Sequence, residues 1–146
     1  MHDKHSDLFI VAVSLIVEHQ GTVLLMRRSA ASAHGAGEWE FPSGRLQQGE
    51  TLEQAVLREG MEETALDLAV EGLFDTFQFR RGAGREHAVG ITFHCRLVSG
   101  EVRLSPEHDD FVWQPLDRPL QVDLPPAVKR SYEKFALAHS AAAPSP

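Results

Sequence analysis

The chain has 146 residues, enough for one domain with a sizeable apolar core, and neither an internal repeat nor a long linker divides it. Its 14 Lys and Arg against 21 Asp and Glu give a net charge of −7, which argues against general binding to duplex nucleic acid. The single cysteine, Cys95, excludes an intramolecular disulfide and favours a reducing, cytoplasmic location.

The first apolar run, Leu8–Val17, is rich in Val and Ile and predicts a central strand over Phe9–Val17, covered on both faces. It is too short to cross a bilayer, and no small-residue cleavage site follows it, so neither a membrane partner nor a signal peptide is indicated. A turn at Glu18–Gly21 leads to a second strand, Thr22–Arg28. A loop of small and glycine residues follows at Ser29–Glu38.

Arg27 and Arg28 end the second strand. Two adjacent arginines at a strand end are usually surface charge. Their place shortly before the segment described next also suits bidentate hydrogen bonds to phosphate oxygens. Both interpretations stay open, and Arg27 and Arg28 are candidate substrate-binding residues.

A turn and a helix come next. Pro42 and Gly44, within Trp39–Gly44, impose a turn that brings the backbone close to the end of the following helix. After Gly49, the run Thr51-Leu52-Glu53-Gln54 is typical of a capping box, in which Thr51 and Gln54 each bond the other's backbone amide. Leu52, Ala55 and Val56 then recur at helical spacing and predict an apolar stripe.

Three glutamates of this helix project to one side. At about 100° per residue, Glu59, Glu62 and Glu63 fall within an arc of about 100°. Like charges at this spacing, acids in the last turn and Gly60 inside the helix all lower helix stability. Such a cluster of exceptions indicates a functional site, and we expect this end of the helix to bind divalent metal. On charge pattern alone, a solvated acidic face with Arg58 paired to Glu62 has about equal weight.

Two long strands are predicted after the helix. They span Ala69–Arg81 and Glu86–Val98, and a turn at Gly82–Gly84 joins them. Phe77 and Phe79 share one face of the first strand. Aromatic residues at this spacing are more often core than a platform that stacks on a base, although Phe79 remains a candidate substrate contact.

Histidines in these strands have an ordinary explanation. His87 and His94 have no second His or Cys at a spacing typical of zinc sites. We therefore interpret both as strand residues rather than metal ligands.

The last part of the chain alternates loops with short elements. A hairpin turn is predicted at Ser99–Glu101, an acidic loop at Ser105–Asp110 and a short strand at Phe111–Pro115. Proline is tolerated in the first turn of a helix, so the proline pair at 125–126 opens a final helix over Ala127–Ala138. A frayed tail follows at Ala141–Pro146.

The segment from residue 44 to residue 66 carries a family pattern, G-x5-E-x7-R-E-U-x-E-E-x-G-U, where U is bulky and apolar. It matches in register at Gly44, Glu50, Arg58, Glu59, Glu62, Glu63 and Leu66. This pattern resembles that of the Nudix hydrolases, and the Trp-Glu-Phe-Pro run at 39–42 is similar to the MutT-like branch. The resemblance implies an α/β fold, a Nudix-type α/β/α sandwich with a mixed central sheet, with the acidic helix on one side and Ala127–Ala138 on the other.

Two positions depart from the pattern. Gly60 stands where the family has a bulky apolar residue, and Ala65 stands where it has Gly. We expect the first change to loosen the packing of the helix. The second should strain the turn after the helix if that turn needs a positive φ.

The resemblance also implies a metal site. Several carboxylates without a His and Cys cluster favour Mg²⁺, with Mn²⁺ as the other choice, over zinc. Glu59 and Glu63 would be direct ligands, Glu62 a ligand or a contact through water, and Ser43 a ligand through its main-chain carbonyl. Glu107, from the loop ahead of a short strand, would be an extra ligand or the general base, with a helix glutamate as the fallback.

The remaining pattern residues have supporting roles. Arg58, counted with the glutamates in the catalytic group, would pair with Glu50 and hold the loop against the helix. Gly44 and Glu50 would therefore give structural support.

Together these residues imply attack of water on phosphorus in a diphosphate linkage of a small-molecule nucleotide. The MutT-like branch suggests a nucleoside triphosphate that yields a monophosphate and pyrophosphate, although another nucleoside diphosphate linked to X also fits. Val128 stands where members specific for oxidised guanine have an Asn. Because valine cannot hydrogen-bond a base edge, a role against oxidised dGTP is not favoured.

Two alternatives use the same fold. A catalytically inactive domain that senses a nucleotide and regulates a partner would typically lose the pattern glutamates, which this chain keeps. A prenyl diphosphate isomerase would want a further Cys, and Cys95 lies in mid-strand. We expect one domain over 1–146, with flexible ends at about 1–7 and 140–146, and exposed strand edges compatible with a homodimer.

Overall fold

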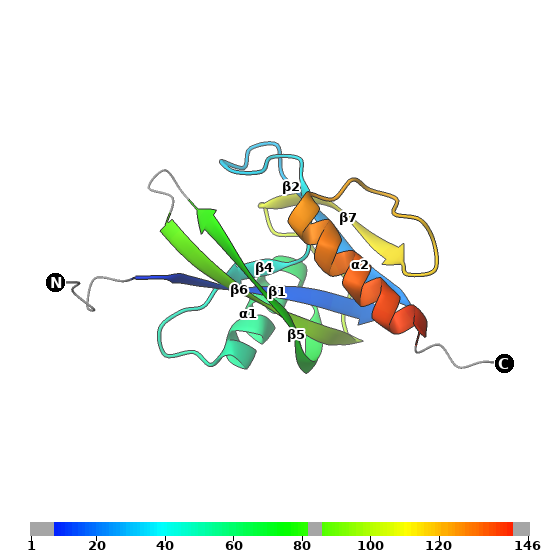
Figure 1. The fold of residues 1–146 in the computed structure, drawn as a ribbon, viewed down its shortest axis with the longest axis horizontal. Helices are drawn as coiled ribbons and strands as arrows, with labels where there is room; N and C mark the ends of the chain where they lie inside the picture. The colour runs from blue at the N-terminus through cyan, green and yellow to red at the C-terminus, as the bar shows by residue number, and fades with distance from the viewer. Residues whose placement is uncertain (1–7, 82–85, 142–146) are drawn as a thin grey trace.

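The computed structural model describes residues 8–81 and 86–141. Figure 1 shows a sheet with one helix on each of its faces. Within the described residues the elements are β1 (Ile10–His19), β2 (Thr22–Arg28), β3 (Trp39–Glu40), β4 (Ser43–Arg45), α1 (Leu52–Thr64), β5 (Asp67–Arg81), β6 (Glu86–Ser99), β7 (His108–Pro115) and α2 (Pro126–Ala141).

The sheet is mixed, as predicted. Its main path runs β3-β2-β1-β6-β5, while β4 pairs with β1 and β7 pairs with β2. β1 and β6 are parallel over nine registered pairs, from Ile10↔Ala88 to Glu18↔Arg96, and the other pairs are antiparallel. The α/β fold class is confirmed.

β1 changes partner along its length. Its first half pairs with β4, where Val13 faces Gly44, and its last residues pair with β2, where Glu18 faces Val23. The short β4 therefore lies beside the central strand. Because α1 follows β4 closely in the chain, the end of α1 is held next to the middle of the sheet.

The alternation of side chains along β1 separates two apolar cores. Val13, Leu15 and Val17 pack with Ala55 and Val56 of α1 on one face. On the other face, Ile16 of the same strand lies in a cluster with Tyr132 and Phe135 of α2. The prediction that the two helices lie on opposite sides of the sheet is confirmed.

The end of α1 shows both departures from the family pattern. Ala65 has φ 61, so the turn does need a positive φ and an alanine there is strained, as expected. Gly60 is buried, and a Cβ placed on it would lie 2.6 Å from Leu68 Cδ1. The expected loosening of the packing is therefore wrong, because Leu68 fills the space that a larger residue would take.

The chain after β6 departs most from prediction. The strand predicted at Phe111–Pro115 begins earlier, at His108, and pairs with β2 rather than β6, so Ser99–Glu101 is not a hairpin turn. The pairing of β7 with β2, two strands far apart in the chain, determines this arrangement. The amide of Arg103 instead donates to the Thr64 carbonyl at 2.9 Å, which ties this connection to the end of α1.

Other boundaries differ less. β3 and β4 lie inside the predicted turn segment, and α2 extends to Ala141. The turn predicted at 82–84 and the tail beyond residue 141 lie outside the described residues. Among the helices that are described, none has the length and apolar character needed to cross a membrane.

Candidate active site

α1 begins with the predicted capping box. The Thr51 hydroxyl accepts from the Gln54 amide at 3.1 Å, and the Gln54 side-chain oxygen accepts from the Thr51 amide at 2.9 Å. This reciprocal pair fixes where the helix starts. It therefore fixes which residues of α1 face β4 two to three turns later.

Arg58 connects the loop to the helix. Its guanidinium donates to both carboxylate oxygens of Glu50, at 2.6 and 2.9 Å, and to the Arg45 carbonyl at 2.9 Å. It also donates to Glu59 at 2.7 Å and Glu62 at 3.2 Å. The Glu50–Arg58 pair is confirmed, and these contacts give Arg58 a positioning role.

Gly44 lets Glu59 come close to β4. A Cβ on Gly44 would lie 2.0 Å from the carboxyl carbon of Glu59, closer than real contacts permit. Burial raises the pKa of the Glu59 carboxyl, and the hydrogen bond and charge of Arg58 oppose that rise. Glu59 thus lies buried against a strand backbone that has no side chain in its way.

Glu63, one turn further, is also buried. Its carboxylate accepts from the Ser43 amide at 3.1 Å. Burial, and to a smaller extent the charges of Glu59, Glu40 and Glu107, raise the pKa of the Glu63 carboxyl to about 8 against that hydrogen bond. Burial thus disfavours the ionised form of Glu63 in the absence of a bound cation.

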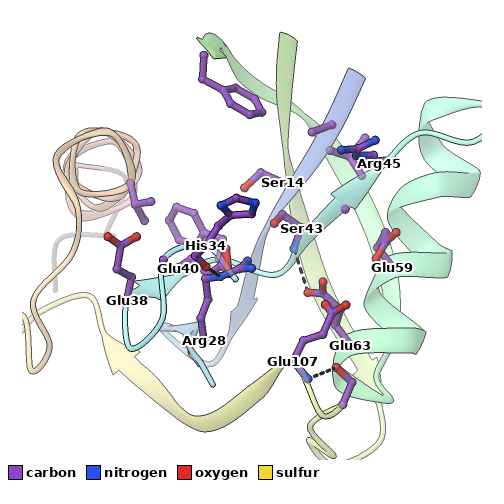
Figure 2. A pocket seen from close by; sticks show the side chains of 18 of the residues that line it. Ser14, Arg28, His34, Glu38, Glu40, Ser43, Arg45, Glu59, Glu63 and Glu107 are labelled. Atoms are coloured by element: carbon purple, nitrogen blue, oxygen red, sulfur yellow. Dashed lines mark hydrogen bonds and ion pairs between the residues drawn. The ribbon is translucent and has the colours of Figure 1, made fainter. Parts of the chain in front are cut away.

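A cleft of about 1120 Å³ opens beside these carboxyls. Glu62 and Glu107 also line it, and both are exposed. In Figure 2 the Glu107 side chain lies close to that of Glu63, below Ser43, while Glu59 lies one turn earlier in α1. The structure thus brings the predicted acids, Ser43 and Gly44 to one cleft.

The two arginines at the end of β2 separate. Arg28 lines the cleft and donates to the Glu40 carboxylate at 3.0 Å, the Ser32 hydroxyl at 2.8 Å and the His34 carbonyl at 2.7 Å. Arg27 is not among the residues of the cleft, and it pairs with Asp109 at 2.7 Å. The phosphate contact predicted for this pair therefore suits Arg28 alone.

Phe77 and Phe79 line the cleft and are only partly buried. Their rings are 5.5 Å apart with 28° between their planes, and Phe77 lies directly over Gly90. Neither belongs to the two apolar cores of the described residues, so the preference for a core role is wrong. Two stacked rings at a cleft wall can receive a flat apolar group such as a base.

Sequence reasoning missed several residues of the cleft. Glu40 accepts from Arg28 and lies 3.3 Å from Nε2 of buried His108, and Glu38, His34 and Ser14 also line the space. Only the Trp-Glu-Phe-Pro run gave a signal for Glu40. Val128 does line the cleft, at the position where the resemblance placed a base-reading Asn.

The acids fit a hard divalent cation. Oxygen donors suit Mg²⁺ or Mn²⁺, and the burial that raises the pKa values of Glu59 and Glu63 makes their ionised forms depend on a nearby cation. Among the described residues, Glu59, Glu62 and Glu63 do not form a set whose carboxylate oxygens all lie within 4.8 Å of one another. Because Arg58 holds Glu59 and Glu62, these side chains have to rotate to share one ion with Glu63.

Comparisons with known proteins agree with this geometry. Residues 8–136 match the NUDIX domain. A nudix hydrolase of Caenorhabditis elegans is 32% identical over 108 residues, which span 72% of this chain and 28% of that longer protein. The CTP pyrophosphohydrolase of Escherichia coli strain K12 is 34% identical over 122 residues, or 81% of this chain and 84% of the relative.

A solved structure agrees as well. The crystal structure of a MutT NUDIX hydrolase from Burkholderia pseudomallei superposes with a TM-score of 0.75 and 30% identity, covering 86% of this chain and 97% of that one. The resemblance to MutT-like proteins is confirmed.

Proposed function

The chain belongs to the NUDIX domain family, and from this premise we propose that it hydrolyses a diphosphate linkage in a nucleotide-type substrate, namely a nucleoside triphosphate. The products would be a nucleoside monophosphate and pyrophosphate. The observation that carries the proposal is the pair of buried carboxyls, Glu59 and Glu63, which both line the cleft and both have raised pKa values.

The cation would be held by Glu59 and Glu63, with Glu62 and the Ser43 carbonyl as further oxygen donors. When bound, Mg²⁺ or Mn²⁺ offsets phosphate charge and stabilises the leaving group. The Ser43 amide fixes one Glu63 oxygen at 3.1 Å, and Arg58 fixes Glu59 at 2.7 Å. The Ser43 amide and the Glu50–Arg58 pair thus hold Glu63 and Glu59 at the cleft, and rotation of Glu59 away from Arg58 would bring its carboxylate to a shared ion.

Glu107 is suited to receive the proton of the attacking water, because its exposed carboxylate lines the cleft near Glu63. The water oxygen would form a bond to one of the two phosphorus atoms of the α–β linkage, the bond from that phosphorus to the bridging oxygen would break, and the monophosphate and pyrophosphate would separate. Arg28 would face phosphate oxygens and the Phe77–Phe79 pair would stack on the base. Val128 lines the cleft where the resemblance places a base-reading Asn, and its apolar side chain offers no hydrogen bond to a purine base.

The CTP pyrophosphohydrolase relative supports a nucleoside triphosphate as substrate, because that alignment spans most of both chains. The test is a panel of ribo- and deoxyribonucleoside triphosphates, nucleotide sugars and ADP-ribose, assayed with Mg²⁺ or Mn²⁺. Products are separated chromatographically, with EDTA as control.

We expect a monophosphate and pyrophosphate in equal amounts from at least one triphosphate, and none with EDTA. Turnover of ADP-ribose or a nucleotide sugar alone would overturn the triphosphate assignment but keep the hydrolase. No turnover across the panel, together with tight nucleotide binding, would replace the enzyme with a nucleotide sensor.

A further inference from the structure

A second group of potential metal ligands lies outside the cleft. Glu18 is the second-last residue of β1, His94 lies within β6, and His139 lies in the last turn of α2. None of the three lines the cleft. Among the described residues they form the set of three acidic, His or Cys side chains whose ligand atoms all lie within 4.8 Å of one another.

The distances suit one small ion. Nε2 of His94 is 2.7 Å from Oε2 of Glu18, and Nε2 of His139 is 3.7 Å from the same oxygen. Zinc bonds of about 2.0–2.2 Å in a tetrahedral site place ligand atoms about 3.4 Å apart. The observed separations lie on either side of that value. The 2.7 Å contact is a hydrogen bond in which Nε2 of His94 donates to the Glu18 carboxylate, so an ion would replace this proton and small side-chain rotations would bring the three atoms to it.

His139 is fixed in the tautomer that a metal ligand needs. Its Nδ1 lies 2.9 Å from the Phe135 carbonyl oxygen, which can only accept, so Nδ1 carries the hydrogen. In the neutral ring, Nε2 then presents a lone pair toward the carboxylate of Glu18. A backbone carbonyl that orients a histidine in this way is typical of metal-binding histidines.

Packing holds both imidazoles in place. The fully buried Phe135 stacks on the His139 ring, with 3.8 Å between the ring centroids. It also meets the His94 ring edge to face, with 4.9 Å between the centroids. The two histidine rings are 5.1 Å apart and nearly perpendicular. The site is therefore preorganised by the apolar core beneath α2.

One side of the group is open to solvent. Glu18 and His94 line a hollow of about 320 Å³, whose other wall includes Arg96 paired with Glu71 at 2.8 Å. An ion can enter from this hollow, and a water molecule can complete its coordination.

We propose that Glu18, His94 and His139 form a second metal site for a zinc-like dication, separate from the magnesium site of the cleft. Two imidazole nitrogens and one carboxylate oxygen suit Zn²⁺ and its transition-metal neighbours, whereas Mg²⁺ prefers oxygen donors alone. The bound ion joins β1, β6 and the last turn of α2. Its effect is structural: it clamps the end of α2 to the sheet.

The test measures thermal unfolding in saturating Mg²⁺, with and without Zn²⁺. At free zinc about 100 times the dissociation constant, the wild-type midpoint should rise by about 5 °C or more. His94→Gln and His139→Gln should lose most of this rise. His87→Gln, which changes an exposed histidine of the same strand, should keep it.

Two further measurements separate this site from the cleft. Glu63→Gln, altered in the cleft, should keep the rise with zinc. Added Co²⁺ should give visible absorption bands, typical of nitrogen and oxygen ligands at low coordination number, in wild type and not in the His94→Gln, His139→Gln double variant.

Each variant is compared with itself without zinc, so a lower starting midpoint does not obscure the result. The proposal is overturned if zinc leaves the wild-type midpoint unchanged, or if the double variant responds as wild type does. It is also overturned if Glu63→Gln abolishes the response, because zinc would then be acting in the cleft.

Discussion

The two helices are attached to the same sheet by different forces. α2 is held by apolar packing, with Phe135 and Tyr132 buried in the core of its face. α1 has an apolar stripe too, but its last two turns face β4 through Arg58, Glu59 and Glu63. Buried carboxyls lower stability where buried rings raise it. The face of α1 thus includes buried groups that cost stability in addition to its apolar packing.

The largest effect is expected for Glu63→Gln, which alters a buried carboxyl on the α1 face. The amide removes a charge that the proposed cation needs, so we expect kcat/KM to fall at least about 100-fold, or about 2.7 kcal/mol. The fold should persist because the amide oxygen can still accept from Ser43. Steady-state kinetics and circular dichroism check both, with Glu53→Gln, exposed on the same helix, as control. Activity at the wild-type level would remove Glu63 from the site.

On the other face the matching change is Phe135→Ala. Deleting a fully buried ring should cost about 3–5 kcal/mol in the free energy of unfolding, measured with urea. Leu137→Ala, on the same helix but 74% exposed, should change it by less than about 0.5 kcal/mol. We expect kcat per folded molecule to be unchanged, and a parallel loss of kcat would show that the two faces are coupled.

Glu50→Ala tests the ionic attachment of α1 directly. It removes both hydrogen bonds that Arg58 donates to Glu50, so the loop between β4 and α1 loses its anchor. We expect roughly a tenfold loss of kcat/KM through misplacement of Glu59, together with a lower thermal midpoint. Glu53→Ala, exposed in the first turn, is the control. A lower midpoint with full activity would separate the anchor from the chemistry.

The pH dependence of the thermal midpoint tests the effect of the buried Glu63 carboxyl on stability. Without metal, the folded pKa of Glu63 is raised from 4.5 to about 8, so the folded protein binds this proton more tightly than the unfolded chain. The contribution is fully present below about pH 4.5 and is lost as pH rises toward 8. In EDTA, the wild-type midpoint should fall by several degrees across that window. The midpoint of Glu63→Gln should fall less, and equal slopes would contradict the assignment.

The smallest expected effect is at Ala65, where α1 ends. A glycine there relieves the strain of φ 61, at the cost of a more flexible unfolded chain. The net gain should be about 0.5–1 kcal/mol, or about 1–3 °C in the thermal midpoint. Ala127→Gly, in the exposed first turn of α2, should lower the midpoint. A lower midpoint for Ala65→Gly would mean that the turn is not strained.

Local sequence predicted much of this molecule. The capping box at Thr51, the arc of glutamates and the two long strands after α1 depend on neighbours a few residues apart, and all are found. The short β4 before α1 was predicted as part of a turn. The partner of β7 is different, because pairing with β2 joins segments about 85 residues apart. No turn signal encodes that choice, so the hairpin prediction after β6 was wrong.

Side-chain direction was the other limit. Because side chains alternate along a strand, Arg27 and Arg28 point to opposite faces of the sheet. The sequence does not say which of these faces lines the cleft. The same uncertainty explains why a core role was preferred for Phe77 and Phe79, with only Phe79 kept as a candidate substrate contact, although both line the cleft. His94 and His139 are 45 residues apart, so no ligand spacing could have joined them; only the packing of α2 on the sheet does.

Because of Gly44, the docking of α1 depends on the register between β4 and β1. The Glu59 carboxyl occupies the place where any other residue would carry its first side-chain carbon. If β4 slipped by one residue along β1, Ser43 or Arg45 would move into that place, and α1 could not close. A misregistered chain would thus leave this helix undocked and open to proteases, and only correctly aligned molecules would acquire the proposed metal site.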